Sequence, residues 1–416
     1  MHIYFNRFNP PSLIVTRMRK RLLLVHHNIN PPAGGAGVAA WGIEALKDDY
    51  EVTVLTWQPI NIDNINRYYG TRLKSAEFKV FFAPSVIRWL YALDPEPNSI
   101  QPIASLMRIG RFLNEKYDAV LTFNNEMDLG EPIIQYIHYP YLAEKINIDR
   151  PPAGLPFLER IKLSFKHRWR PWLLISGFNR ERMLKNLTLV NSDWTGEVVR
   201  KAYGISSVTV YPPIEVQTAH TEWECRENSF VAIGRIDREK SWARIIEILS
   251  NLRQKGYDIR LHIVGSLDAT SIQSGYYQEF KQLILENSAW VKLVGNISRM
   301  DLFKVIAKAR YGIHAREEEH FGMAVAEMTM GGCVVFAPNN GGQTEILAKD
   351  TRLLFDSADD AVQKIANILD NPEAQHELQA KLLSQAQSYS LERFIRQMRE
   401  VVREHITHRQ NTARLD

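Results

Sequence analysis

Short apolar runs alternate with longer segments of helical periodicity over most of the chain. In the first half, the apolar runs predict strands at residues 21–26, 50–56, 119–122, 133–138, 187–191 and 208–211. Helical patterns stand between some of these runs, at residues 35–46 and through 198–203. Strands that alternate with helices are typical of a parallel sheet with right-handed crossover connections.

A polar segment marked by two adjacent prolines interrupts this pattern. It runs from Pro212 to about Asn228 and has the composition of a boundary between domains. The alternation then starts again, with strands predicted at 229–233, 260–264, 291–294 and 311–314 and helices at 242–254, 277–287 and 302–309. We therefore predict an α/β protein with two Rossmann-like, doubly wound parallel-sheet domains that bind ligands in a cleft beyond the carboxyl ends of their strands.

The domain boundaries follow from the same pattern. We assign residues 1–215 to an N-terminal domain and residues 216–390 to a C-terminal domain, followed by a C-terminal helix at 391–416. Residues 1–17 are interpreted as an extension, because the apolar run of the first strand begins only after Met18.

Composition and charge exclude several classes of protein. The 416 residues are 45% hydrophobic and 24% charged, as in an ordinary globular protein, and a net charge of +4 is too small to indicate nucleic-acid binding. Cys225 and Cys333 provide no disulfide framework, which fits a reducing compartment. No apolar run reaches the roughly 18–20 residues that cross a bilayer, and residues 1–20 lack the features of a signal peptide. We expect a cytoplasmic protein, with peripheral contact to the inner face of the membrane left open.

The most informative stretch of the chain is Glu319-His-Phe-Gly-Met-Ala-Val-Ala-Glu327. Its two glutamates are separated by about 2.2 helical turns, so they cannot lie side by side on one regular helix face. If a helix begins near Phe321, Glu319 lies in the loop before it and Glu327 in its second turn. The N–H groups at the start of that helix could bind a diphosphate, and the carboxylates could bind sugar hydroxyls. An amphipathic helix with surface glutamates would produce the same spacing.

Polar residues and glycines follow three other predicted strands. Arg235 and Lys240 could contact a diphosphate from the loop after residue 233, although a solvated charged loop is the simpler explanation. Gly34 and Gly35 could let the backbone approach a ligand, or could merely let the chain turn. His138 ends a predicted strand, where a histidine is more often structural, but a strand end in this fold faces the cleft.

A longer pattern appears when the residues after Glu327 are included. The run Val-Val-Phe-Ala-Pro-Asn-Asn-Gly-Gly-Gln-Thr-Glu345 predicts a buried strand and a glycine turn that opens another helix. The whole block resembles the donor-site signature of retaining GT-B glycosyltransferases of family 4, the group 1 type. In that signature two glutamates separated by seven residues precede a Gly-Gly-x-x-Glu turn. The resemblance covers about residues 20–390.

Three shorter motifs resemble one branch of this family, the lipid-linked oligosaccharide alpha-mannosyltransferases. These motifs are His138-Tyr-Pro140, Asn191-Ser-Asp-Trp-Thr195 and Glu318-Glu-His-Phe-Gly-Met323. For the Asn-Ser turn, capping of a helix by Ser192 is a sufficient structural explanation.

The resemblance implies the GT-B fold and a hexosyltransferase. Such an enzyme moves a sugar, with mannose as the weaker expectation, from a nucleotide-diphosphate sugar to a glycan, lipid-linked or small-molecule acceptor. The first domain would bind the acceptor and the second the donor, and the C-terminal helix would pack back on the first domain. Two alternatives stay open: a GT-B nucleotide-sugar epimerase, and a catalytically inactive scaffold subunit that binds a sugar nucleotide. The base, the sugar, the acceptor and the linkage stay open as well.

The resemblance also implies a role for each candidate residue. Catalytic roles fall on Glu319, His138, Arg235 and Lys240, donor binding on Arg235, Lys240, Glu319, Phe321, Gly322, Met323 and Glu327, and an acceptor or phosphate loop on Gly34 and Gly35. The sequence has no His or Cys pair at metal-binding spacing and no Asp-x-Asp element at a strand end. We therefore expect a metal-independent site without a cofactor, in which arginine, lysine and a helix dipole stabilise the diphosphate.

Residues 158–186 are dense in basic and aromatic side chains, as in Phe165-Lys-His-Arg-Trp-Arg-Pro-Trp172. This composition suits peripheral contact with an anionic membrane. A helical pair with a solvated basic face would have the same composition. A surface that binds nucleic acid would also have this composition, but we do not expect nucleic acid as a partner.

Overall fold

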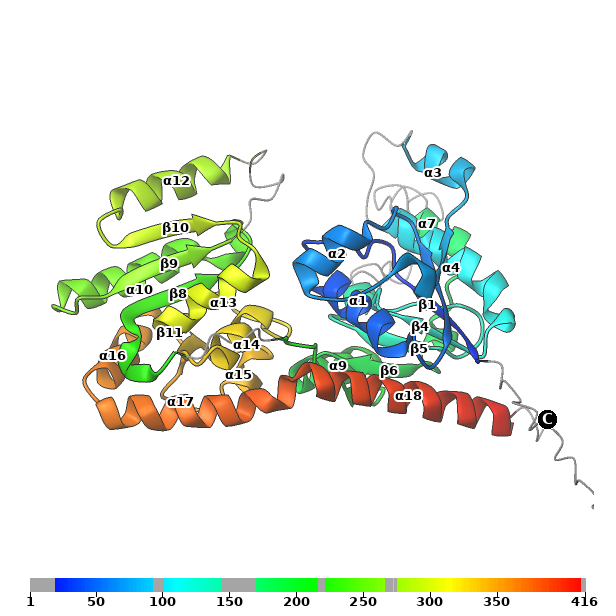
Figure 1. Ribbon diagram of the computed structural model, residues 1–416. Helices are drawn as coiled ribbons and strands as arrows, with labels where there is room; N and C mark the ends of the chain where they lie inside the picture. The colour runs from blue at the N-terminus through cyan, green and yellow to red at the C-terminus, as the bar shows by residue number, and fades with distance from the viewer. Residues whose placement is uncertain are drawn as a thin grey trace, which may run out of the picture.

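The computed structural model describes residues 19–92, 100–143, 170–215, 221–265, 272 and 275–412. These residues form two parallel α/β units that lie side by side, joined by two crossings of the chain (Figure 1). The predicted fold class is therefore confirmed. The predicted extension at residues 1–17 and residues 158–169 of the basic and aromatic segment lie outside the described residues.

The first unit is a seven-stranded parallel sheet in the order β3-β2-β1-β4-β5-β6-β7. Its strands are β1 Arg21–Val25, β2 Glu51–Thr56, β3 Lys79–Phe82, β4 Ala119–Thr122, β5 Ile134–Ile137, β6 Leu187–Val190 and β7 Val208–Thr209. Its helices are α1 Gly34–Leu46, α2 Ile62–Tyr69, α3 Ser85–Ala92, α4 Ile100–Leu113, α7 Arg170–Ser176, α8 Arg180–Met183 and α9 Asp193–Tyr203, with short 3₁₀ turns η1 Ser75–Glu77 and η2 Asn114–Lys116.

Apolar side chains of the central strand β1 are buried on both faces of this sheet. Leu22 and Leu24 belong to the cluster that contains α1, whereas Leu23 and Val25 belong to the cluster that contains α4. A strand covered by helices on both faces has no solvated face, which is why its sequence is a continuous apolar run and not an alternating one.

The second unit is a six-stranded parallel sheet in the order β10-β9-β8-β11-β12-β13. Its strands are β8 Glu227–Ile233, β9 Arg260–Val264, β10 Val291–Gly295, β11 Ala309–Ile313, β12 Val334–Pro338 and β13 Leu354–Phe355. Its helices are α10 Trp242–Gln254, α12 Tyr276–Glu286, α13 Arg299–Lys308, α14 Met323–Met330, α15 Gln343–Ile346, α16 Ala358–Leu369 and α17 Pro372–Ala386, with 3₁₀ turns η3 Trp223–Cys225, η4 Arg238–Lys240 and η5 Gln387–Tyr389.

Two predicted boundaries in the second unit need correction. The helix expected near Phe321 begins at Met323, because Gly322 adopts a φ of 107° and ends the loop in a left-handed conformation. The helix expected at 302–309 begins at Arg299, where Ser298 accepts a hydrogen bond from the N–H of Asp301 and caps it.

The last helix, α18 Leu391–Thr412, returns to the first unit and lies along it (Figure 1). Its buried side chains follow every fourth position, at Phe394, Met398, Val402 and Ile406, and share a core cluster with α1. Arg399 Nε donates a 2.7 Å hydrogen bond to the carbonyl of Ala45 at the end of α1. The helix therefore completes the core of the domain that begins the chain.

We predict that Met398→Ala destabilises the first unit by about 2–5 kcal/mol, the usual cost of a cavity at a buried methionine. Met398 is fully buried in the interface between α18 and α1. Urea unfolding followed by circular dichroism measures the loss. Glu404→Ala, at an exposed position of the same helix, is the matched control and should change stability by no more than about 0.5 kcal/mol. Equal losses of stability in Met398→Ala and Glu404→Ala would contradict the packing of α18 on α1.

Candidate functional site

Each sheet has a point at which the strand order changes direction. It lies between β1 and β4 in the first sheet and between β8 and β11 in the second. Ligands of open parallel sheets bind beyond the strand ends at such points. The segments that follow β1, β8 and β11 contain the predicted site residues Gly34, Gly35, Arg235, Lys240 and Glu319.

A buried ion cluster surrounds the carboxylate of Glu319. Lys240 Nζ lies 2.7 Å from Glu319 Oε2, and the two side chains are only 14% and 15% exposed. His314 Nε2 lies 3.2 Å from the same oxygen, and Arg316 Nη1 lies 3.9 Å from it. The structure thus brings together two residues that the sequence analysis had selected separately, Glu319 and Lys240.

The protonation states in this cluster follow from its charges. Burial alone would raise the pKa of Glu319, but the hydrogen bond from His314 and the positive charges of Lys240 and Arg316 outweigh it and hold that pKa well below its ordinary value. Burial lowers the pKa of His314. Glu319 is therefore an ionised carboxylate at neutral pH, and His314 donates to it as a neutral imidazole.

The loop after β8 is folded so that it presents Lys240 toward Glu319. The Asp237 side chain accepts a hydrogen bond from the N–H of Lys240 and caps the turn η4, and the indole of Trp242 donates to the carbonyl of Arg235 at 3.0 Å. The guanidinium of Arg235 lies 3.2 Å from Asp237 and is about half exposed. Arg235 is thus held at the rim of the loop, outside the buried cluster.

Glu327 lies in the second turn of α14 and has a different cation as its partner. Arg299 Nη1 lies 3.0 Å from Glu327 Oε1, and both side chains are largely buried. Arg299 Nη2 also donates to the carbonyl of Glu215, at 3.0 Å. The second glutamate of the motif is therefore connected to the segment that joins the two domains, and not to the Glu319 cluster.

The first domain contributes His138 and the glycine loop. A ring N–H of His138 donates to the carbonyl of Phe123, and burial lowers the pKa of His138 to about 4. Its Nε2 is buried and has no hydrogen-bond partner among the described residues. A Cβ at Gly35 would lie 3.1 Å from this nitrogen. His138 is therefore a neutral imidazole with an acceptor nitrogen beside the glycine loop.

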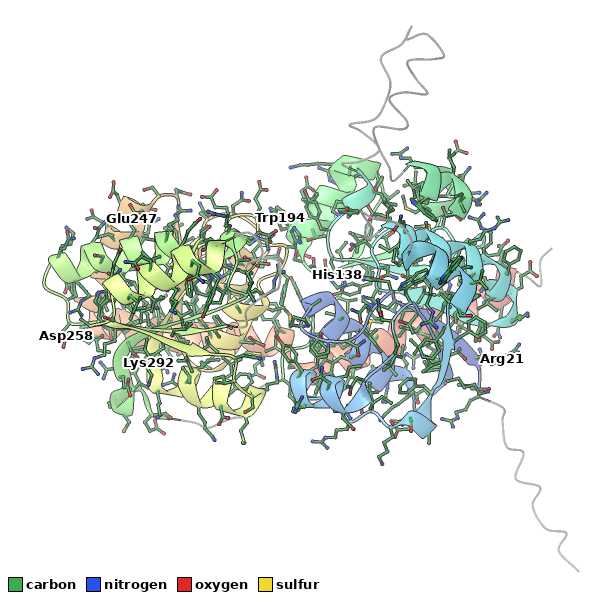
Figure 2. The ribbon with its side chains drawn as sticks, turned by 90° about the horizontal axis from the view of Figure 1, so that it is seen from above. Arg21, His138, Trp194, Glu247, Asp258 and Lys292 are labelled. Atoms are coloured by element: carbon green, nitrogen blue, oxygen red, sulfur yellow. The ribbon has the colours of Figure 1, made fainter. Side chains whose placement is uncertain are left out.

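Two helix N-termini approach each other at the boundary between the domains. Neither α1 nor α14 has a side-chain cap. A Cβ at Gly34, the first residue of α1, would lie 3.9 Å from the side chain of Met323, the first residue of α14. Figure 2 shows the neighbouring His138 in the middle of the molecule, far from Arg21 at one end and Asp258 at the other. Uncapped helix N-termini favour anions, so this region suits a phosphate group.

Phe321 does not present its ring to this region. The ring is buried and packs against Tyr211 at 5.9 Å and Tyr389 at 5.6 Å between centroids. Gly322 is also buried, and its backbone at φ 107° would strain any other residue. A donor contact at these two positions would involve the backbone, because the ring of Phe321 points into the core.

Sequence analysis missed three members of the site. His314 and Arg316 carry a usable signal, since the strand predicted at 311–314 ends there and strand ends line the cleft. Arg299 carries none, because it lies in the first turn of α13 and reaches Glu327 only through the tertiary fold. Among the described residues, no group of three or more His, Cys, Asp or Glu side chains could hold a metal ion. None of the described helices combines the length and apolarity needed to cross a membrane.

Comparison with curated proteins gives distant relatives of one kind. The GDP-Man:Man(3)GlcNAc(2)-PP-Dol alpha-1,2-mannosyltransferase of Dictyostelium discoideum is 23% identical over 302 residues, which make up 66% of this chain and 59% of that protein. The human protein of the same name is 26% identical over 302 residues, or 65% of this chain and 59% of that protein. This chain therefore spans less than two thirds of the length of these relatives.

Comparison with solved structures gives the same architecture over nearly the whole chain. HepE of Anabaena in complex with UDP and glucose has a TM-score of 0.63 at 13% identity, covering 92% of this chain and 99% of that one. WaaG, a glycosyltransferase involved in lipopolysaccharide biosynthesis, has a TM-score of 0.62 at 14% identity, covering 91% and 99%. Residues 213–385 match the family described as glycosyl transferases group 1. The chain therefore has the GT-B fold, and residues 213–385 are similar to the glycosyl transferases group 1 family.

Proposed function

We propose that this protein is a retaining glycosyltransferase that takes a hexose from a nucleotide-diphosphate sugar. The observation that carries the proposal is the ionised Glu319 carboxylate, paired with Lys240 at 2.7 Å beside the uncapped start of α14. A carboxylate next to cationic and helix-dipole groups suits a ligand with sugar hydroxyls at one end and a diphosphate at the other. The similarity of residues 213–385 to glycosyl transferases group 1 and the mannosyltransferase names of the curated relatives support the same reaction class.

Each side chain has a defined part in this proposal. Arg235, Lys240 and the start of α14 stabilise the departing nucleoside diphosphate electrostatically. Lys240, His314 and Arg316 all contact Glu319 through Oε2, so Oε1 is the oxygen that would accept from the sugar hydroxyls. Glu327 would accept from the ribose hydroxyls, in competition with Arg299.

The first domain supplies the group that we propose for the acceptor side of the site. His138 Nε2 would accept a hydrogen bond from a hydroxyl of the transferred sugar, near the acceptor. The acceptor oxygen forms the new bond to the anomeric carbon on the face from which the diphosphate oxygen leaves, and the acceptor proton passes to that departing oxygen. The site then needs no covalent nucleophile and no metal, since cationic side chains hold the leaving group.

GDP-mannose and a lipid-linked glycan are the substrates to test first. This choice rests on the names of the curated relatives, which are GDP-Man-dependent mannosyltransferases acting on a dolichol-linked glycan. It rests also on an apolar surface at the end of the first domain where α3 and α7 lie (Figure 1). There Val86 and Trp89 of α3 are 66% and 61% exposed, and Leu174 and Ile175 of α7 are 81% and 61% exposed.

Leu173 of α7 belongs to a buried core cluster, and Ile87 of α3 packs against the same cluster. Both helices therefore add exposed apolar side chains over the same part of the core. Arg170 is the first residue of α7, and Lys166 and Arg168 come shortly before it in the sequence. Exposed apolar side chains and a basic sequence segment next to them suit contact with an anionic bilayer, where a lipid-linked acceptor would be found.

We predict that Lys240→Ala and Arg235→Ala lower turnover of the nucleotide sugar about a hundredfold, the usual effect of removing one preorganised contact to a transition state. The assay follows release of GDP or UDP from GDP-mannose and UDP-glucose, with and without an acceptor. Arg238→Ala, in the same turn but paired with Glu279 on the surface, is the matched control and should keep full turnover. Native circular dichroism must accompany each variant. Wild-type turnover in both Lys240→Ala and Arg235→Ala would contradict the assignment, and an inactive wild type would favour a binding subunit.

We predict that turnover survives excess EDTA. Lys240 and Arg235 supply positive charge that a bound metal ion supplies elsewhere. The measurement is a steady-state rate before and after chelation, with a magnesium-dependent glycosyltransferase treated in parallel as the control. Complete loss of activity that magnesium or manganese restores would show that the site uses a metal.

We predict that the protein binds vesicles containing anionic lipid and that binding falls as salt rises, because each basic group near such a surface contributes roughly 1 kcal/mol. Co-sedimentation with vesicles at low and high salt measures it. Vesicle binding should weaken in the triple variant Lys166→Ser, Arg168→Ser and Arg170→Ser. It should also weaken in the double variant Leu174→Ser and Ile175→Ser. Val208→Ser, at an exposed position of the edge strand β7, should not weaken it. A wild type that ignores anionic vesicles at every salt concentration would leave a soluble acceptor as the better proposal.

A further inference from the structure

A cross-domain contact lies directly behind the loop that carries Glu319. The carboxylate of Glu345, in α15 of the second domain, accepts hydrogen bonds from two backbone N–H groups at the start of α9 in the first domain. The distances are 3.0 Å from the N–H of Asp193 and 2.7 Å from the N–H of Trp194. Glu345 is 8% exposed, and the hydroxyl of Tyr211 also donates to it, at 3.0 Å.

This contact completes the N-terminus of α9. Ser192, the residue before the helix, accepts from the N–H of Thr195, so the first helical N–H groups are shared between a cap from the same domain and a carboxylate from the other. The hydroxyl of Ser192 donates in turn to the carbonyl of His320, at 2.6 Å. A carboxylate at a helix N-terminus is favoured by both charge-assisted hydrogen bonds and the helix dipole.

The ring of His320 adds a second connection between the domains. It stacks on Tyr139 with centroids 4.3 Å apart and planes inclined by 14°, and it lies nearly parallel to Trp194 at 6.2 Å. Tyr139 follows His138 and His320 follows Glu319 in the sequence. Figure 2 shows His138 and Trp194 on the side of the first domain that meets the second.

Glu345 is tied to the backbone of Glu319 by a glycine turn. The carbonyl of Glu319 accepts from the N–H of Gly342 at 2.7 Å, and Glu319 and Gly341 form an isolated bridge. A Cβ at Gly342 would lie 2.4 Å from the carbonyl oxygen of His320 and 2.9 Å from the hydroxyl of Ser192. Gly342 is therefore the point at which both domains and the Glu319 loop meet, and the contact leaves no space for a larger residue.

We infer that Glu345 and His320 are positioning residues that dock the start of α9 onto the Glu319 loop and so set the placement of Glu319 relative to His138. Neither side chain needs to touch the substrate. The inference rests on the proposed transferase function for its kinetic consequence, whereas the docking itself stands on the contacts above. A nucleotide held by the second domain alone would still bind when the docking is weakened, but transfer between the two domains would slow.

The test uses Glu345→Gln in the full chain. The amide of Gln cannot accept at both positions, so one N–H of α9 loses its partner. We expect GDP and UDP to bind within about twofold of the wild type by calorimetry. We expect kcat to fall on the order of a hundredfold, as for a small misplacement of reacting groups. Glu373→Gln is the matched control, because it removes an exposed carboxylate from the first turn of α17 and should leave both quantities unchanged.

Hydrogen exchange measures the docking without any activity. Amides of Asp193 and Trp194 should be protected in the wild type and exchange faster in Glu345→Gln. Tyr211→Phe removes only one hydroxyl donor to Glu345, so its amide exchange and its kcat should change in the same direction but by less. It replaces Glu345→Gln in the test if that variant does not fold. The positioning role would be overturned if folded Glu345→Gln had the same turnover as Glu373→Gln, or if it lost nucleotide binding. Unprotected amides in the wild type would overturn the docking, whereas an inactive wild type with protected amides would overturn only the proposed transferase.

Discussion

The candidate site depends on one buried carboxylate that stays ionised. Glu319 is largely buried, and only the contacts with Lys240, His314 and Arg316 keep its charged form favourable. A buried ion pair is seldom the most stable way to fill such a space, because desolvation offsets the Coulomb attraction. The cluster is better understood as a preorganised polar surface, in which the charges are already in place before a ligand arrives.

The two glutamates of the motif have separate surroundings, and this separation follows from where the helix begins. Gly322 ends the loop at φ 107°, so Glu319 stays with the strand-end residues while Glu327 turns to the other side, toward Arg299. Arg299 also contacts the carbonyl of Glu215, next to the segment that joins the domains. A ligand group that displaced Arg299 from Glu327 would therefore act on a residue connected to both domains.

The chain passes between the domains twice, and the two passages lie together. The N–H of Ile214 donates to the carbonyl of Tyr389 at 3.1 Å, and Ile214 forms a parallel bridge with Ser390. After the second passage, α18 packs on α1 and closes the first core. The two passages therefore contact each other, and the hydrogen bonds of Glu345 to the start of α9 add a separate contact between the domains.

The sequence by itself determined the two parallel sheets and several strand-end residues, because burial on both faces produces local apolar runs and ligands gather where those runs end. His138, Arg235 and Lys240 stand near predicted strand ends, Glu319 was selected from its spacing to Glu327, and the roles of all four came from the resemblance to the family 4 signature. Only the tertiary structure decided which of them meet. Lys240 contacts Glu319 across 79 residues and Trp194 contacts Glu345 across 151. Such pairings depend on how strand ends and helices are placed in space, and local periodicity contains no information about that placement.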